Sequence, residues 1–131
     1  MKTIVAVFLF SACMTLSAHA QTGGDILKGC KMLQQIEAHD CKDGNCAHFK
    51  KNEVLRAIGS YQFFVGYVLG VRTSQAAGQS ARMVDFPADF DPHALVAPLI
   101  SYLESDPKAQ AQHASIGVYT FLLKTYPGKK R

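Results

Sequence analysis

The sequence lacks the common short catalytic motifs. It has no Cys-x-x-Cys pair for thiol exchange, no Cys-x-x-Cys-His segment for haem attachment and no Gly-x-Ser-x-Gly nucleophile motif. It also has no His-Glu-x-x-His zinc helix and no glycine-rich phosphate-binding loop. These absences exclude the enzyme classes that such motifs mark. We therefore expect neither catalytic residues nor a cofactor.

The chain also carries little charge. Its formal net charge is +4, only 18% of its residues are charged, and 48% are apolar. So small a positive charge argues against a nucleic-acid-binding protein, and the apolar content argues against disorder. A length of 131 residues allows one modest domain with its own hydrophobic core.

The N-terminal segment has the features of a signal peptide. Lys2 is the only charged residue before Ala20, Ile4–Phe10 is apolar, and Ala18-His19-Ala20 is the small-x-small pattern that signal peptidase recognises. We expect residues 1–20 to be cleaved after Ala20, leaving an exported domain of residues 21–131.

Cysteine usage agrees with export but leaves two questions open. Phe10-Ser11-Ala12-Cys13 loosely resembles a lipobox, so the alternative to a soluble chain is one anchored to the membrane through Cys13. The exported domain keeps Cys30, Cys41 and Cys46, and an oxidising compartment favours one disulfide with one thiol left over. The turn residues between Cys41 and Cys46 permit a local bridge, and Cys30 is an equally suitable partner for either.

One polar cluster has residue types that bind zinc. It consists of His39, Asp40, Cys41, Cys46 and His48. Its spacing matches no strong zinc-finger pattern, and thiols in an oxidising compartment pair with each other. We therefore expect a disulfide-stapled loop here and no metal.

Hydrophobic periodicity predicts helices along the whole domain. Asp25–Ala38 is amphipathic, and Asn52 is a suitable N-cap for a second helix that runs to about Ser74. Asp91-Pro92 starts a third helix, in which Pro98 predicts a slight kink, and the last is a single helix over residues 107–125. The predicted fold is an all-α single domain, a compact bundle of about four main helices.

The second predicted helix is apolar nearly all round, so it must be surrounded by its own domain or by a second subunit. Its uncharged run, Ala57–Val71, is fifteen residues long and so too short to span a bilayer. Gly59, Gly66 and Gly70 fall on one side of it, which predicts that another backbone packs closely there. An internal helix crossing is the simpler interpretation, and a dimer axis is the alternative.

The polar segment 75–91 is too long for a tight connection between helices, and long connections are often functional. We interpret it as a binding loop whose apolar anchors are Met83 and Phe86. Its polar contacts would be Gln75, Gln79, Ser80, Arg82 and Asp85. The competing interpretation is a loose connection with Phe86 tucked into the core.

Several segments, in order, resemble one protein family. Gly66-Tyr67-Val68-Leu69-Gly70 is followed by a polar loop ending near Pro87, by Tyr102-Leu103-Glu104-Ser105-Asp106-Pro107, and by Tyr126-Pro127. This order resembles the periplasmic immunity proteins of type VI secretion amidase effectors (the Rap/Tai group), over roughly residues 54–127. That family has cysteines where this chain has Phe64 and Phe86, so its disulfide is not carried over.

The resemblance implies an all-helical, non-catalytic inhibitor in the periplasm, often dimeric. Its partner would be a peptidoglycan amidase of the papain-like cysteine peptidase kind, whose Cys–His groove a protruding loop occludes. By analogy that loop is 75–91, with Gln79, Ser80, Arg82 and Asp85 entering the groove. The alternatives are a small periplasmic stress chaperone or envelope factor and, third, an enzyme with a Cys/His site.

Overall fold

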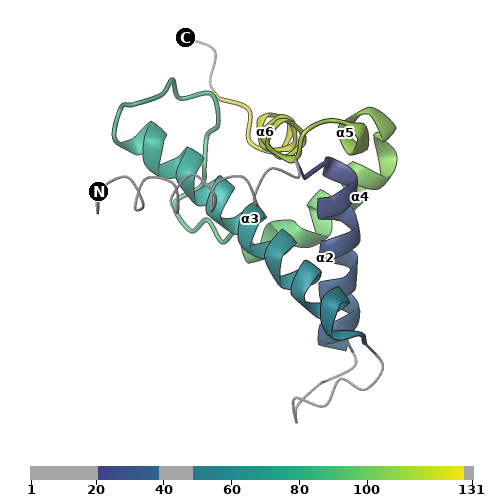
Figure 1. The fold of residues 1–131 in the computed structure, drawn as a ribbon. Coiled ribbons are helices and arrows are strands. Elements are labelled where there is room, and N and C mark those ends of the chain that lie inside the picture. Colours follow the sequence, from purple (N-terminus) through teal and green to yellow (C-terminus); the bar gives the residue numbers. More distant parts are fainter. Residues whose placement is uncertain (1–20, 39–48, 129–131) are drawn as a thin grey trace, which may run out of the picture.

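The computed structural model describes residues 21–38 and 49–128. Their elements are α2 (Gly23–Ala38), α3 (Lys51–Ala76), the 3-10 helix η1 (His93–Leu95), α4 (Val96–Ser105), α5 (Pro107–Ala111) and α6 (Ala114–Thr125). Figure 1 shows these helices packed into one body. Within this part of the chain no strand forms, which confirms the predicted all-α single domain.

α2 contacts four other helices, α3, α4, α5 and α6, and Figure 1 shows it crossing α3. Ile26 and Cys30 on α2 are fully buried. They belong to one apolar core to which every α-helix contributes. The other members are Phe64, Val68, Val84, Leu95, Val96, Leu99, Ile100, Leu103, Ala109, Ala114, Val118, Phe121 and Leu122. Burial of this continuous apolar surface is what stabilises the fold.

Side-chain caps fix several helix starts. Asp25 accepts hydrogen bonds from the backbone N–H (2.9 Å) and the hydroxyl (3.0 Å) of Thr22, and these bonds lower the pKa of Asp25. Asp106 accepts from the N–H groups of Lys108 and Ala109, both at 3.1 Å, at the start of α5. The prediction that Asn52 caps α3 is wrong, because the helix begins at Lys51 and its N-cap is Lys50.

The predicted single helix over 107–125 is broken into α5 and α6. The chain is extended at Gln112 (φ −76°, ψ 162°), and the Nδ1 atom of His113 then caps α6 by accepting from Ser115 N–H at 3.3 Å. Gln112 C=O instead accepts from Gly23 N–H at 2.9 Å, and Ala114 N–H donates to Gln21 C=O at 2.7 Å. The prediction failed because residues 21–23, which lead into α2, form backbone hydrogen bonds with Gln112 and Ala114. A continuous helix would have used these backbone groups internally.

The kink expected at Pro98 has no structural basis. α4 begins at Val96, so Pro98 lies in its first turn. N–H groups in a first turn have no partner within the helix, so a proline there removes no hydrogen bond.

The close helix packing predicted at Gly59, Gly66 and Gly70 is also wrong within this chain. A Cβ atom built on any of the three has no neighbour within 4 Å, so their side of α3 is open. Close backbone approach occurs on α2, where a Cβ on Gly29 would lie 2.3 Å from Ser60 Cβ and one on Gly23 would lie 2.1 Å from Ala109 O. Both glycines are buried. They let α2 pack tightly against α3 and α5.

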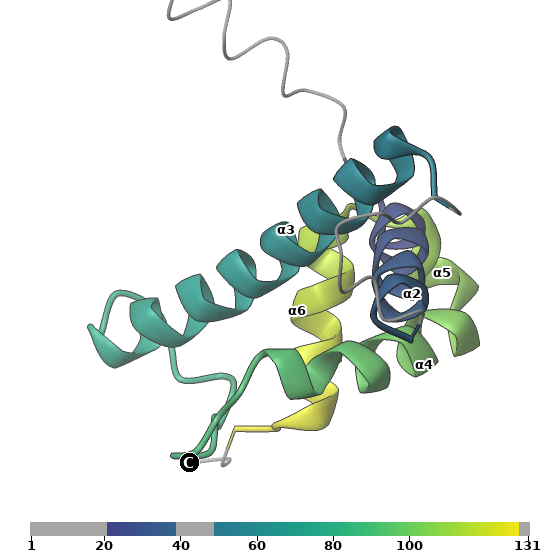
Figure 2. The same cartoon turned by 90° about the horizontal axis from the view of Figure 1, so that it is seen from below.

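α3 is covered on one side only. Ala57, Ser60, Phe64, Val68 and Gln75 are buried, and the C-terminal half extends past the other helices (Figure 2). The fifteen-residue uncharged run was predicted to be too short to span a bilayer. The observed helix has 26 residues, so its length does not exclude a membrane span. By length and composition α3 could cross a bilayer, a property that core helices of soluble proteins often share. Within its apolar 18-residue window, 22% is buried inside the protein. Leu55, Ile58 and Leu69 are the large apolar side chains of α3 that the described chain leaves exposed.

Candidate functional site

The segment that follows α3 leaves the helix through a tight turn. Gly78 has φ 71°, a left-handed conformation that glycine adopts without strain. Ala77 N–H donates to Thr73 C=O and Gln79 N–H to Ser74 C=O, both at 2.9 Å, so the last carbonyls of α3 are paired. The chain direction is thus set before the polar segment begins.

The side-chain amide of Gln75 fixes the backbone of the polar segment at Met83 and Val84. Its Nε2 donates to Val84 C=O at 2.9 Å, and its Oε1 accepts from the N–H groups of Met83 (3.0 Å) and Val84 (3.1 Å). The side chain is 6% exposed. Gln75 was expected to contact a partner, but its side chain is buried and both polar atoms of its amide are hydrogen-bonded to the loop backbone, so it is a positioning residue and not a contact residue.

The C-terminal segment holds the same loop from the other side. Asp85 N–H donates to Tyr126 C=O at 2.9 Å and Gly128 N–H to Met83 C=O at 3.0 Å, which pairs the segments around Val84 and Pro127. A Cβ on Gly128 would lie 2.8 Å from Met83 O, so only glycine allows this approach.

The second half of the loop is packed by aromatic rings. Phe86 and Phe90 meet edge-to-face with centroids 4.8 Å apart, and each lies 6.1 Å from the Tyr126 ring. The Arg72 guanidinium lies 5.4 Å from the centre of the Phe90 ring. Phe86 packs against the core, as the competing interpretation of the loop had it. Arg72 and Phe90 were not predicted from the sequence, and Tyr126 was named only as part of the resemblance; the aromatic residues near Pro87 and Pro127 were the signal.

The remaining predicted contact residues are exposed. They are Gln79, Ser80, Arg82, Met83 and Asp85. Met83 is 52% exposed, although its backbone is hydrogen-bonded on both sides. Arg82 and Asp85 place charges of both signs beside it. The loop therefore presents an exposed apolar side chain and two exposed charged side chains of opposite sign on a hydrogen-bonded backbone, and apolar and charged groups together are typical of a protein interface.

Among residues 21–38 and 49–128, no group of three His, Cys, Asp or Glu residues could hold a metal ion. The Tyr61 hydroxyl is hydrogen-bonded to His93 Nδ1 at 3.1 Å on the surface, whereas Cys30 is fully buried. The polar cluster His39, Asp40, Cys41, Cys46 and His48, for which a disulfide-stapled loop without metal was predicted, lies outside these residues.

Cys30 was a disulfide candidate, but the structure shows a free thiol. Its side chain is fully buried on the core side of α2. Burial in apolar surroundings raises the pKa of Cys30 from 9.0 to about 11, because the thiolate would lose its hydration. A thiol with so little thiolate is a poor nucleophile and a poor metal ligand.

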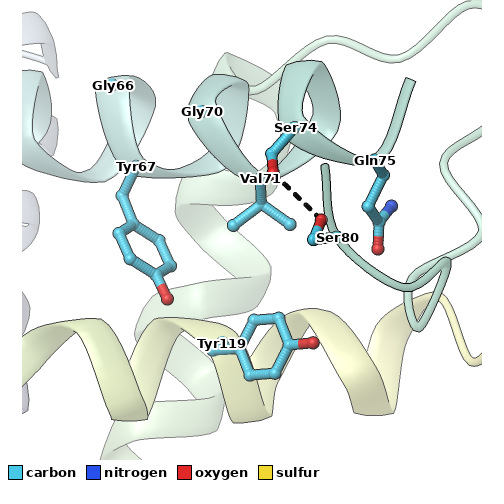
Figure 3. Close-up of a pocket in the computed structure, with 8 residues that line it drawn as sticks. All are labelled: Gly66, Tyr67, Gly70, Val71, Ser74, Gln75, Ser80 and Tyr119. Atoms are coloured by element: carbon cyan, nitrogen blue, oxygen red, sulfur yellow. Dashed lines mark hydrogen bonds between the residues drawn. The ribbon is translucent and has the colours of Figure 1, made fainter. Parts of the chain in front are cut away.

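A pocket of about 470 Å³ opens beside the base of the loop, between α3 and α6. Figure 3 shows Tyr67 and Val71 pointing from α3 toward α6, with Tyr119 below them and Ser80 at the loop end. Gly66, Gly70, Ser74 and Gln75 complete the lining. Two of the three glycines of α3 therefore border a hollow where a packed helix was expected. The sequence reasoning did not single out Tyr119, whose position on α6 gave no signal.

Comparisons with protein-family models, with curated proteins and with solved structures found no match to this chain.

Proposed function

We propose that this chain is an exported, non-catalytic inhibitor that binds a peptidoglycan amidase of the cysteine peptidase type in the periplasm. The observation that carries the proposal is the loop 79–85, which displays an exposed side-chain surface on a backbone held by Gln75 and by the C-terminal segment. A loop ordered before binding loses little entropy on entering a groove, so its contacts contribute more fully to affinity. The class of partner in this proposal comes from the resemblance of several segments, in order, to amidase immunity proteins.

In this function each exposed loop residue has a role that follows from its side-chain chemistry. Met83 is the apolar anchor that fills the groove, and Arg82 and Asp85 set the orientation through charge pairing at the rim. Gln75 acts from beneath by keeping Met83 and Val84 in place. A specific complex of this kind buries about 1,600 Å² in total, so adjoining helix surface takes part as well.

A single substitution at the loop tests this function. Met83→Asp removes the apolar anchor and adds a charge at a side chain that is 52% exposed, so the fold is expected to be unaffected. We expect affinity for the amidase encoded by a neighbouring gene to fall at least about 30-fold, the loss typical of an interface hot spot. Calorimetric titration and inhibition of peptidoglycan hydrolysis measure the effect.

Ile116→Asp is the matched control, because Ile116 is also 52% exposed but lies on α6. It should bind and inhibit like the unmodified protein. Equal affinity of the Met83 variant would remove the loop from the mechanism. Failure of the unmodified protein to inhibit any neighbouring amidase would end the proposal itself.

We also propose that the protein forms a homodimer through the open side of α3. Leu55 is 56% exposed, and Ile58 and Leu69 are each 41% exposed. An antiparallel crossing of two α3 helices centred on Gln62 would place Leu55 opposite the second copy's Leu69. It would also place Ile58 opposite the second copy's Gly66, whose missing Cβ leaves room for it. Such a contact is self-complementary about a two-fold axis.

The dimer is tested by sedimentation at micromolar concentration. Ile58→Asp places a charge in each half of the symmetric contact and is expected to weaken association at least about 100-fold, giving a monomer. Ile116→Asp, whose side chain is similarly exposed on α6, should stay dimeric. A monomeric unmodified protein, or a dimer insensitive to Ile58→Asp, would contradict this arrangement.

A further inference from the structure

Met83 places a sulfur atom on the exposed surface of the loop 79–85. Its side chain is 52% exposed, and it is not among the apolar side chains that pack against the core. The other methionine of the described chain, Met32 on α2, is half-buried. The susceptibility of sulfur side chains to oxidation rises with their exposure. Met83 is therefore the methionine of the described residues that a dissolved oxidant reaches first.

The backbone of Met83 is fixed on both sides, so its side chain cannot withdraw from the surface. Met83 N–H donates to Gln75 Oε1 at 3.0 Å, and Met83 C=O accepts from Gly128 N–H at 3.0 Å. The next residue, Val84, is 3% exposed and is hydrogen-bonded to the same glutamine. Any change in the chemistry of the Met83 side chain therefore changes the surface that the loop offers to a partner.

The thiol of Cys30 is shielded from the same reaction. This side chain is free but fully buried, and burial raises the pKa of Cys30 to about 11. Thiols react with oxidants as thiolates, so Cys30 is unreactive at neutral pH. A thioether has no proton to lose, so Met83 reacts without such a requirement. Of these two sulfur atoms, only that of Met83 is both accessible and chemically ready.

We propose that hydrogen peroxide oxidises Met83 to methionine sulfoxide and thereby switches off the binding loop, an inference that rests on the proposed inhibitor function. The sulfur lone pair attacks one peroxide oxygen, and the S–O bond forms as the O–O bond breaks. The leaving hydroxide takes the proton from the transferred oxygen and departs as water. Sulfur loses two electrons and the peroxide gains them. A methionine sulfoxide reductase reverses the change, with two electrons and two protons from a dithiol that becomes a disulfide.

The sulfoxide changes the polarity of the anchor and little else. It adds a strong hydrogen-bond acceptor to the side chain that the inhibitor places in the groove of its partner. Burying this oxygen without a donor is unfavourable, so we expect affinity to fall at least about tenfold. The loss is smaller than that expected for Met83→Asp because the sulfoxide is neutral. The dimer contact proposed on α3 does not include Met83, so oxidation leaves association unchanged.

The test treats the purified protein with hydrogen peroxide and locates the added oxygen by mass spectrometry of its peptides. Calorimetric titration then measures binding to the amidase encoded by a neighbouring gene. We expect Met83 to gain oxygen before Met32, and affinity to fall in step with the oxidised fraction of Met83. Treatment with methionine sulfoxide reductase should restore the affinity. Circular dichroism and sedimentation should show the helical fold and the association state unchanged.

Three variants separate Met83 from the other sulfur atoms of the chain. Met83→Leu cannot be oxidised at this position, so its affinity should be the same before and after peroxide treatment. Met32→Leu removes the half-buried methionine and should stay as sensitive to peroxide as the unmodified protein. Met83→Gln carries a neutral polar group of similar length and should lose affinity at least about tenfold without any oxidant.

Oxidation of Met32 ahead of Met83, equal affinity of the oxidised and untreated protein, or the same peroxide-induced loss in Met83→Leu would each overturn the proposal. Binding by the untreated protein is measured first, which separates the two proposals. If the untreated protein binds no amidase, the inhibitor function fails and its regulation fails with it. If the untreated protein binds and the oxidised protein binds equally well, only the regulation fails.

Discussion

Gly29→Ala is expected to destabilise the protein by about 2 kcal/mol, although alanine is the better helix former. Its Cβ would lie 2.2 Å from Ser60 Oγ, 2.3 Å from Ser60 Cβ and 3.3 Å from Arg56 O. A rotation of the serine side chain relieves only the first contact, so α2 and α3 must move apart. Overpacking of this kind costs about 1–3 kcal/mol or more, against a helix-propensity gain of about 1 kcal/mol.

The matched substitution on α3 should have the opposite sign. Gly70→Ala places a Cβ in open space and is expected to stabilise the protein by about 1 kcal/mol through helix propensity alone. Urea unfolding followed by circular dichroism measures both variants. Adding Ser60→Gly to Gly29→Ala removes the clashing atoms, so the pair should show a coupling of about 1 kcal/mol or more. Stabilisation by Gly29→Ala would mean that the two helices are not packed as described.

Stability is expected to fall by about 3 kcal/mol between pH 9 and pH 11 because of Cys30. In the unfolded chain this thiol ionises with a pKa near 9.0, whereas burial holds the folded pKa at about 11. Above pH 9 the unfolded state therefore loses a proton that the folded state keeps. The free energy of unfolding falls as the pH rises to about 11, where the folded state loses this proton as well. Each pKa unit corresponds to about 1.4 kcal/mol.

The control for this prediction is Cys30→Ala. That variant keeps every other titrating group, so the difference between its free energy of unfolding and that of the unmodified protein isolates Cys30. The difference should be constant below pH 9 and should shrink as the pH rises to 11. Parallel curves over the whole range would show that the thiol is not buried as the structure has it.

The hydrophobic pattern predicted the limits of a helix well where they depend only on the apolar face that packs against the core. α2 and α3 begin and end within two residues of the predicted limits, because a stripe of apolar residues has to face a core. The loop was also found from its composition, and five of the seven predicted contact residues are exposed, whereas Gln75 is buried and Phe86 packs against the core. The burial of Gln75 was unpredictable because it depends on Val84 returning to it from nine residues further along the chain.

The sequence by itself determined the all-helical class, the single core and the position of the polar loop, since each follows from local periodicity and turn chemistry. Only the tertiary structure decided which glycines meet a neighbouring backbone, because Gly29 and Gly70 look alike until the helix axes are placed. It also decided the break at Gln112, where the segment before α2 competes for the backbone hydrogen bonds. Both are contacts between segments distant in sequence, and no local pattern encodes the geometry of such contacts.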